Sequence, residues 1–180
     1  MHHTTKKRVF EEASLIFQMY GIPHTIVFEA LFARERLGNN ALGAGVALPH
    51  CRLKDVDHPM AAIVILPRPI YIDPTPPDTK PVDIFFFLVV PDTDDDEAYL
   101  PLLRECIAML ENRKICDEIR QAENTVEVCS TIMNWTPRRH LSLKTKMMLS
   151  PKNGNNLTRR SNRHNQYTIL CQLTLLLSLR

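Results

Sequence analysis

The chain has 180 residues, 44% of them hydrophobic and 23% charged, which is enough for one globular domain with a core and some additional length. Its net charge of +2 hides an uneven distribution: residues 1–136 carry 13 basic and 20 acidic side chains, whereas residues 137–180 carry nine basic and no acidic ones. Five cysteines without a C-x-x-C pair argue against a disulfide framework or a zinc ribbon, and no secretory leader or long apolar run is present, so a cytoplasmic protein without a membrane span is expected.

Two helices are expected near the N-terminus. In residues 6–20, apolar side chains recur at the spacing of one helical face, with Thr5 placed to cap the helix and Gly21 to end it. A second helical pattern covers residues 25–36 and stops at Gly38. The sequence therefore predicts two amphipathic helices followed by a glycine-containing loop.

Strands and helices alternate in the middle of the chain. Apolar and β-branched runs bounded by Gly, Pro and Asp predict buried strands at residues 45–48, 61–66 and 82–90. The six prolines of residues 67–81 favour extended or turning chain. After an acidic loop, helical patterns follow at residues 99–110, around 115–119 and at 126–135. These elements predict a single layered α/β domain, residues 1–136, in which a mixed β-sheet is flanked by helices.

The segment at residues 137–180 differs in kind from the domain. It is rich in Arg, Lys, Asn and Ser and ends in an apolar run that shares no periodicity with the rest. The composition favours a disordered or non-native extension, such as one from a shifted reading frame. A basic arm that binds nucleic acid or a membrane surface is the alternative.

One stretch carries most of the chemical information. Residues 34–51 read RERLGNNALGAGVALPHC: a cationic helix end, a loop with glycines, a short apolar strand and a histidine after a proline. The glycines allow backbone N–H groups to approach an anion, and Pro49 presents His50 from a stiff position. Near neutral pH an imidazole has a free lone pair and is a competent nucleophile toward phosphorus. Arg34 or Arg36 can neutralise charge on the transferring group.

This ordering resembles the phosphorylation-site signature of the mannitol, fructose and nitrogen-regulatory enzyme IIA family of the bacterial phosphotransferase system. The match consists of Glu35, Leu42, Gly43, the run VALPH at residues 46–50, and Cys51. Because many positions match at fixed spacing, the signal is specific, and the likeness extends over roughly residues 4–136. The nitrogen-regulatory branch has the most similar pattern.

The resemblance implies roles for several residues. His50 accepts a phosphoryl group from a histidine-phosphorylated carrier protein, and Arg34 matches the arginine that stabilises the phosphate. Arg36 and Arg52 are weaker candidates for the same role. No cofactor and no metal are implied.

The chain departs from the family pattern at three places. Asn39 and Asn40 stand where hydroxyl residues are usual, so amide donors are expected to contact the phosphate in place of hydroxyl groups. Tyr99 stands at the start of the helix where relatives commonly have a second histidine. The chain also opens later than the family usually does, almost at the first shared helix.

Other kinds of site are weighed against this interpretation. The loop lacks the G-x-x-x-x-G-K-[ST] pattern of a nucleotide site. Four residues could in principle bind a metal, but their spacing follows no zinc pattern: His24, His50, Cys51 and His58. The acidic residues 92–97 begin like a calcium loop but lack its glycine and its final glutamate.

Two functions remain open. The chain is expected to act as a regulatory switch whose partner binding depends on phosphorylation of His50. The alternative is a sugar-specific enzyme IIA component that passes the phosphate to a permease domain. The donor in both cases is the histidine-phosphorylated carrier protein; the regulatory target is unknown, and the domain is not expected to bind nucleic acid.

Overall fold

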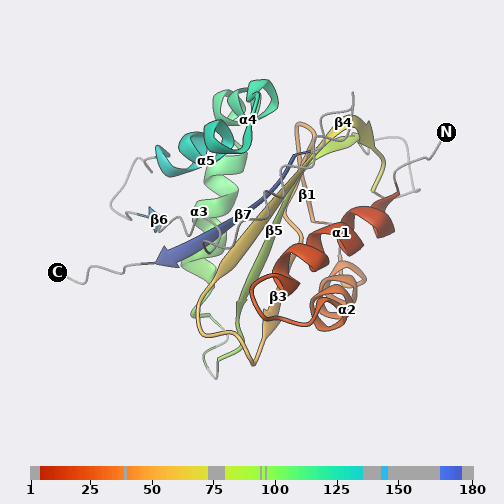
Figure 1. Ribbon diagram of the computed structural model, residues 1–180, viewed down its shortest axis with the longest axis vertical. Coiled ribbons are helices and arrows are strands. Elements are labelled where there is room, and N and C mark those ends of the chain that lie inside the picture. Colours follow the sequence, from red (N-terminus) through yellow and green to blue (C-terminus); the bar gives the residue numbers. More distant parts are fainter. Residues whose placement is uncertain are drawn as a thin grey trace, which may run out of the picture.

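The computed structural model describes residues 5–38, 40–72, 80–93, 95 and 97–135, and the backbone of two strands at 143–145 and 167–175. Within these residues a mixed sheet has α1 and α2 on one face and α3, α4 and α5 on the other (Figure 1). This arrangement confirms the predicted fold class. No helix among the described residues is long and apolar enough to cross a membrane.

The first two helices lie on the same side of the sheet in Figure 1, and they pack against each other. Helix α1 spans Lys6–Gln18, and the Thr5 hydroxyl accepts a hydrogen bond from the Arg8 backbone N–H at 3.3 Å, which confirms the predicted cap. Helix α2 spans His24–Glu35. Between them the chain reverses at Gly21, whose φ of +88° suits glycine best.

Strand β5 (Val82–Pro91) lies at the centre of the sheet. It pairs antiparallel with β4 (Met60–Ile70) and parallel with both β2 (Val46–Ala47) and β3 (His50–Leu53). Strand β1 (Ala41–Gly43) pairs antiparallel with β2. The strand order is β1-β2-β5-β4-β7-β6, with β3 also on β5, so parallel and antiparallel pairs occur in one sheet.

The second helical layer follows β5. Helix α3 spans Leu100–Leu110, α4 spans Arg113–Gln121 and α5 spans Thr125–Met133. Asn112 and Asn124 cap α4 and α5 through side-chain hydrogen bonds to the Ile115 and Glu127 backbone N–H groups. These helices occupy the segments in which the sequence predicts them.

Strand β7 (Tyr167–Leu175) falls within the segment predicted as a tail. It pairs antiparallel with β4, and β6 (Leu143–Thr145) pairs with β7. The tail was not expected to add strands to the sheet, and a β-branched and apolar run such as residues 167–175 can satisfy its backbone groups on the edge of β4. The rest of the segment lies outside the described residues, and the domain boundary at residue 136 stays a prediction.

The central strand contributes to two hydrophobic cores because its side chains alternate between the faces of the sheet. Phe86 packs under α3, α4 and α5, whereas Phe85 and Phe87 pack under α1 and α2, and all three are at most 1% exposed. Phe10 of α1 meets Phe87 edge to face, with ring centroids 5.1 Å apart. Such a pair contributes about 0.5–1.5 kcal/mol beyond the burial of its area. The sheet is therefore anchored from both sides.

Candidate functional site

The candidate site begins where the chain beside β5 is interrupted between β2 and β3. Strands β2 and β3 follow each other along the same edge of β5, with Ala47 opposite Phe85 and His50 opposite Leu88. Between them Pro49 has no N–H to donate to the ladder, while its carbonyl accepts a hydrogen bond from the Leu88 N–H at 2.9 Å. His50, which follows the predicted strand at residues 45–48, is the first residue of a further strand, β3. It is therefore held by the central strand.

The interruption also determines the tautomer of His50. Its Nδ1 lies 3.0 Å from the Leu48 carbonyl oxygen. A carbonyl can only accept a hydrogen bond, so Nδ1 carries the proton, and in the neutral ring the lone pair is on Nε2. The ring is half-buried. The backbone thus presents one defined nucleophilic nitrogen.

Burial lowers the pKa of His50 below its ordinary value of 6.5. The Leu48 carbonyl opposes this by raising the pKa, the positive charge of Arg34 lowers it, and the negative charge of Glu35 raises it. The net direction is downward, so the neutral, nucleophilic ring is the form present near neutral pH. The same causes show that the charges of Arg34 and Glu35 act on the imidazole.

Arg34 and Glu35 lie in the last turn of α2, which packs against β3. Arg34 is half-buried, whereas Arg36, the cap residue that follows, is exposed. The Glu35 side chain is 7% exposed and forms an ion pair with Lys6 of α1 at 3.4 Å. Of the two arginines predicted from this helix end, Arg34 is the one whose charge acts on the histidine.

Arg52 lies on β3, the strand that begins at His50, and its guanidinium contacts the ring of Tyr99. Residues 50 and 52 lie on one face of β3, because strand side chains alternate. The Arg52 guanidinium forms an ion pair with Asp92 at 2.7 Å and donates a hydrogen bond to the Thr93 carbonyl at 2.9 Å. Its central carbon lies 5.6 Å from the centroid of the Tyr99 ring, which is within cation–π range.

Tyr99 is the residue immediately before α3, as the sequence predicts. The ring of Tyr99 thus reaches the strand of His50 through Arg52.

The two predicted amide contacts to phosphate are placed differently. Asn39 lies outside the described residues. Asn40 is 7% exposed, and its Nδ2 donates a hydrogen bond to the Glu35 carboxylate at 2.5 Å. The Asn40 side chain therefore binds a neighbouring side chain in this structure.

The glycine-rich loop forms a tight hairpin turn between β1 and β2. Gly43, Ala44 and Gly45 all have positive φ, and the Gly45 carbonyl accepts hydrogen bonds from the Asp83 and Ile84 N–H groups of β5. A Cβ on Gly45 would lie 2.8 Å from side-chain atoms of both Arg120 and Asp83. These glycines serve the turn and a close side-chain approach.

Arg120 is a structural residue that the sequence analysis did not single out. Its guanidinium binds both carboxylate oxygens of Asp83 at 2.8 Å and donates to the Ala44 carbonyl at 2.7 Å. It therefore ties α4 to β5 and to the hairpin turn. Asp117, three residues earlier, also pairs with it at 3.3 Å, but the two partners that tie α4 to the sheet and the turn are 37 and 76 residues away, and no local pattern marks them.

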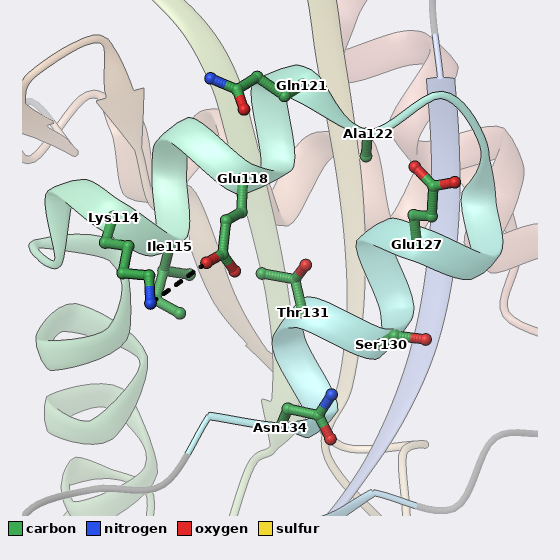
Figure 2. Close-up of a pocket in the computed structure, with 9 residues that line it drawn as sticks. All are labelled: Lys114, Ile115, Glu118, Gln121, Ala122, Glu127, Ser130, Thr131 and Asn134. Atoms are coloured by element: carbon green, nitrogen blue, oxygen red, sulfur yellow. Dashed lines mark ion pairs between the residues drawn. The ribbon is translucent and has the colours of Figure 1, made fainter.

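A shallow hollow between α4 and α5 lies elsewhere on the molecule (Figure 2). Lys114 and Glu118 form an ion pair at 3.7 Å on its α4 side, and Thr131 of α5 faces them. None of its lining residues belongs to the predicted site. Among the described residues no cluster of three or more His, Cys, Asp or Glu side chains could hold a metal ion.

A comparison against protein families identifies the family of the chain. The family model described as "Phosphoenolpyruvate-dependent sugar phosphotransferase system, EIIA 2" matches residues 1–135. The chain belongs to this family. It is therefore a phosphocarrier or regulatory component of the phosphotransferase system, and the resemblance inferred from residues 34–51 is confirmed.

Relatives within the family point to its nitrogen-regulatory members. A nitrogen regulatory protein of Pseudomonas aeruginosa is 39% identical over 120 residues, covering 66% of this chain and 76% of the relative. The nitrogen regulatory protein of Escherichia coli is 34% identical over 134 residues, covering 73% of this chain and 80% of that protein.

Solved structures extend the likeness to the fold. The nitrogen regulatory protein IIA-Ntr from Neisseria meningitidis matches with a TM-score of 0.65 and 35% identity, over 73% of this chain and 89% of that one. The mannitol IIA protein from Escherichia coli matches with a TM-score of 0.59 over 73% of this chain and 92% of that one. At 17% identity the second likeness shows the shared fold alone.

Proposed function

We propose that this EIIA 2 protein accepts a phosphoryl group on Nε2 of His50 from a histidine-phosphorylated carrier protein. The observation that carries the proposal is the hydrogen bond from Nδ1 to the Leu48 carbonyl, which leaves the lone pair on Nε2. The lowered pKa of His50 supports it, because the ring is neutral at the pH of the cell. Family membership supports a donor within the phosphotransferase system.

The transfer requires no proton to move. The Nε2 lone pair attacks phosphorus, and the P–N bond of the donor's phosphohistidine breaks, leaving its electron pair on the donor ring. His50 keeps its Nδ1 proton on the Leu48 carbonyl, so a positive charge develops on the ring as the new P–N bond forms. The Glu35 carboxylate acts on that ring with opposite charge and stabilises it.

Arg34 acts on the other reacting group. Its charge disfavours a cationic imidazole before transfer, which keeps the nucleophile neutral. The same positive charge attracts and stabilises the negative phosphoryl group of the donor. A guanidinium can bind two phosphoryl oxygens at once. Arg52 is a weaker candidate for this role, since Asp92 and the Thr93 carbonyl already bind its guanidinium.

We further propose that the phosphate serves as a regulatory mark whose downstream partner remains to be identified. The names of the relatives support a regulatory role. Tyr99 supports it as well, because a phenol near this strand can donate a hydrogen bond but does not become cationic near neutral pH as a histidine would. A second cationic group would stabilise the charge of the phosphoryl group during onward transfer, so its absence slows that step and favours holding the phosphate over passing it on.

The test is to mix the full chain with purified, already phosphorylated carrier protein and to map the product. One acid-labile phosphohistidine is expected at residue 50, and phosphorus–proton coupling in NMR spectra should place the phosphate on Nε2. A phosphate on Nδ1 of the same residue would contradict the tautomer that the Leu48 contact imposes. A phosphate on another residue would contradict the proposal as a whole.

The lowered pKa of His50 predicts a pH profile. Above its ordinary value of 6.5 the ring is neutral, so the rate of phosphate acceptance should stay level from about pH 8 to 6.5. It should fall only as the pH drops through the lowered pKa of the folded protein, because protonation removes the Nε2 lone pair. An NMR titration of the His50 ring protons should give a midpoint below pH 6.5. A midpoint above 6.5 would contradict the lowered pKa of His50.

A further inference from the structure

We propose that Glu35 and Asn40 form a positioning pair that holds the Leu48 carbonyl, and with it the imidazole of His50, in the orientation for transfer. The Asn40 amide and the Glu35 carboxylate bind each other, so beyond the charge effect of Glu35 the pair acts on the reaction through the position of the imidazole. The inference rests on the proposed function, since the orientation matters for attack by Nε2.

A continuous set of polar contacts connects α1 to His50. Lys6 Nζ lies 3.4 Å from Glu35 Oε1, and Asn40 Nδ2 donates to Glu35 Oε2 at 2.5 Å. The backbone carbonyl of Asn40 accepts a hydrogen bond from the backbone N–H of Leu48 at 2.9 Å. The Leu48 carbonyl in turn accepts the Nδ1 proton of His50 at 3.0 Å. Each oxygen of the Glu35 carboxylate thus has a partner.

Burial makes this arrangement specific. The Glu35 side chain and Asn40 are each 7% exposed. A carboxylate with so little contact with water requires charged or hydrogen-bonding partners, and a carboxylate only accepts, so the Asn40 amide must direct its NH2 group toward it. That requirement fixes the side chain of Asn40 and with it the backbone at the start of the β1–β2 hairpin.

The backbone of Leu48 is held in position by residue 40. Leu48 precedes the proline that interrupts the chain between β2 and β3, so β5 does not hold it as it holds those two strands. Its N–H is bound by the Asn40 carbonyl instead. The N–H and the carbonyl of Leu48 lie in two successive peptide units that share the Leu48 α-carbon. If the Glu35–Asn40 bond is lost, a shift of the 47–48 unit therefore changes the direction of the Leu48 carbonyl, and the Nδ1 proton of His50 loses a fixed acceptor.

The experiment combines a readout of the ring with one of the chemistry. Nitrogen-15 NMR of the full chain gives the tautomer of His50, and phosphoramidate, a small phosphoryl donor, gives the charging rate without any carrier protein. The variants are Glu35→Gln, Asn40→Ala and Asn40→Asp. The control is Glu11→Gln, which removes an exposed α1 carboxylate paired with Lys7 at 3.7 Å.

Each of the three test variants should show a mixed His50 tautomer and charge about 10- to 100-fold more slowly, as expected for a misplaced reacting group. The control should match the wild type in both readouts. An unchanged tautomer and rate in folded Glu35→Gln and Asn40→Ala proteins would overturn the proposal.

A double variant guards against a simple loss of folding. Glu35→Gln combined with Asn40→Asp exchanges donor and acceptor: the glutamine NH2 can donate to the new aspartate, so the buried hydrogen bond and the single negative charge are retained. Compared with Asn40→Asp alone, the double variant should regain the single His50 tautomer and a faster charging rate with phosphoramidate. A double variant that is folded but no better than Asn40→Asp would count against positioning.

The two proposals can fail separately. If phosphorylated carrier protein does not charge the wild type, the proposed function fails, yet the tautomer of His50 in the variants still tests the positioning pair. If the carrier charges every variant at the wild-type rate and the tautomer stays unchanged, the positioning pair fails and the proposed function stands.

Discussion

Replacing His50 with alanine is expected to abolish acceptance of phosphate from the carrier protein, because it removes the nitrogen lone pair that attacks phosphorus. The measurement is the transfer of labelled phosphate from purified phosphorylated carrier to the full chain. No acid-labile label above background is expected on the variant. The effect should be the largest of any single substitution, since no other residue replaces the nucleophile.

Two controls separate lost chemistry from lost structure. His58→Ala removes an exposed histidine of the loop that precedes β4 and should charge at the wild-type rate. His50→Gln preserves an N–H donor near the Leu48 carbonyl and should stay folded, as judged by circular dichroism and thermal melting, while still accepting no phosphate. Label that persists on either His50 variant would disprove the assignment of the nucleophile.

Arg34→Ala should slow transfer by about 100- to 1,000-fold, the effect of removing one preorganised charge-stabilising donor, or about 2.7–4 kcal/mol of transition-state stabilisation. The charge of Arg34 lowers the pKa of His50, so its removal should raise that pKa above the wild-type midpoint. A slower rate together with a higher midpoint is therefore the expected signature, measured by charging kinetics and NMR titration.

Neighbouring arginines provide the comparison for Arg34. Arg36→Ala removes an exposed charge one residue beyond α2 and should leave the rate nearly unchanged. Arg34→Lys keeps the charge but not the bidentate contact with the phosphoryl oxygens. The titration midpoint of His50 should therefore lie closer to its wild-type value than the rate of phosphate transfer does. If Arg34→Ala charges as fast as the wild type, phosphate stabilisation must be assigned to Arg52 or to the donor protein.

Much of the architecture could be predicted because it depends on neighbours in the chain. The spacing of apolar residues marked the helices, Thr5 marked the start of α1, and the buried runs at residues 61–66 and 82–90 marked the two long strands. Local patterns work here because a helix cap or an alternating strand uses contacts within a few residues.

The placement of His50 could not be predicted in full. The sequence pattern does not indicate a strand at residues 50–53, but parallel pairing with residues 88–91 makes them one. The close approach of Arg120 and Asp83, which requires a glycine at residue 45, could not be predicted either. Both outcomes depend on segments that are far apart in the sequence, and residue type alone does not reveal such pairings.

The amino-acid sequence by itself determined the family signature, the identity of the candidate nucleophile and the order of the main elements, because these depend on residue types at fixed short spacing. Only the tertiary structure decided which nitrogen of His50 holds the lone pair and which charges act on its ring. Those properties arise where α2, the residues before β1 and the interruption between β2 and β3 meet. There, burial strengthens each contact, and the Leu48 carbonyl, which any residue type would supply, selects the reactive atom.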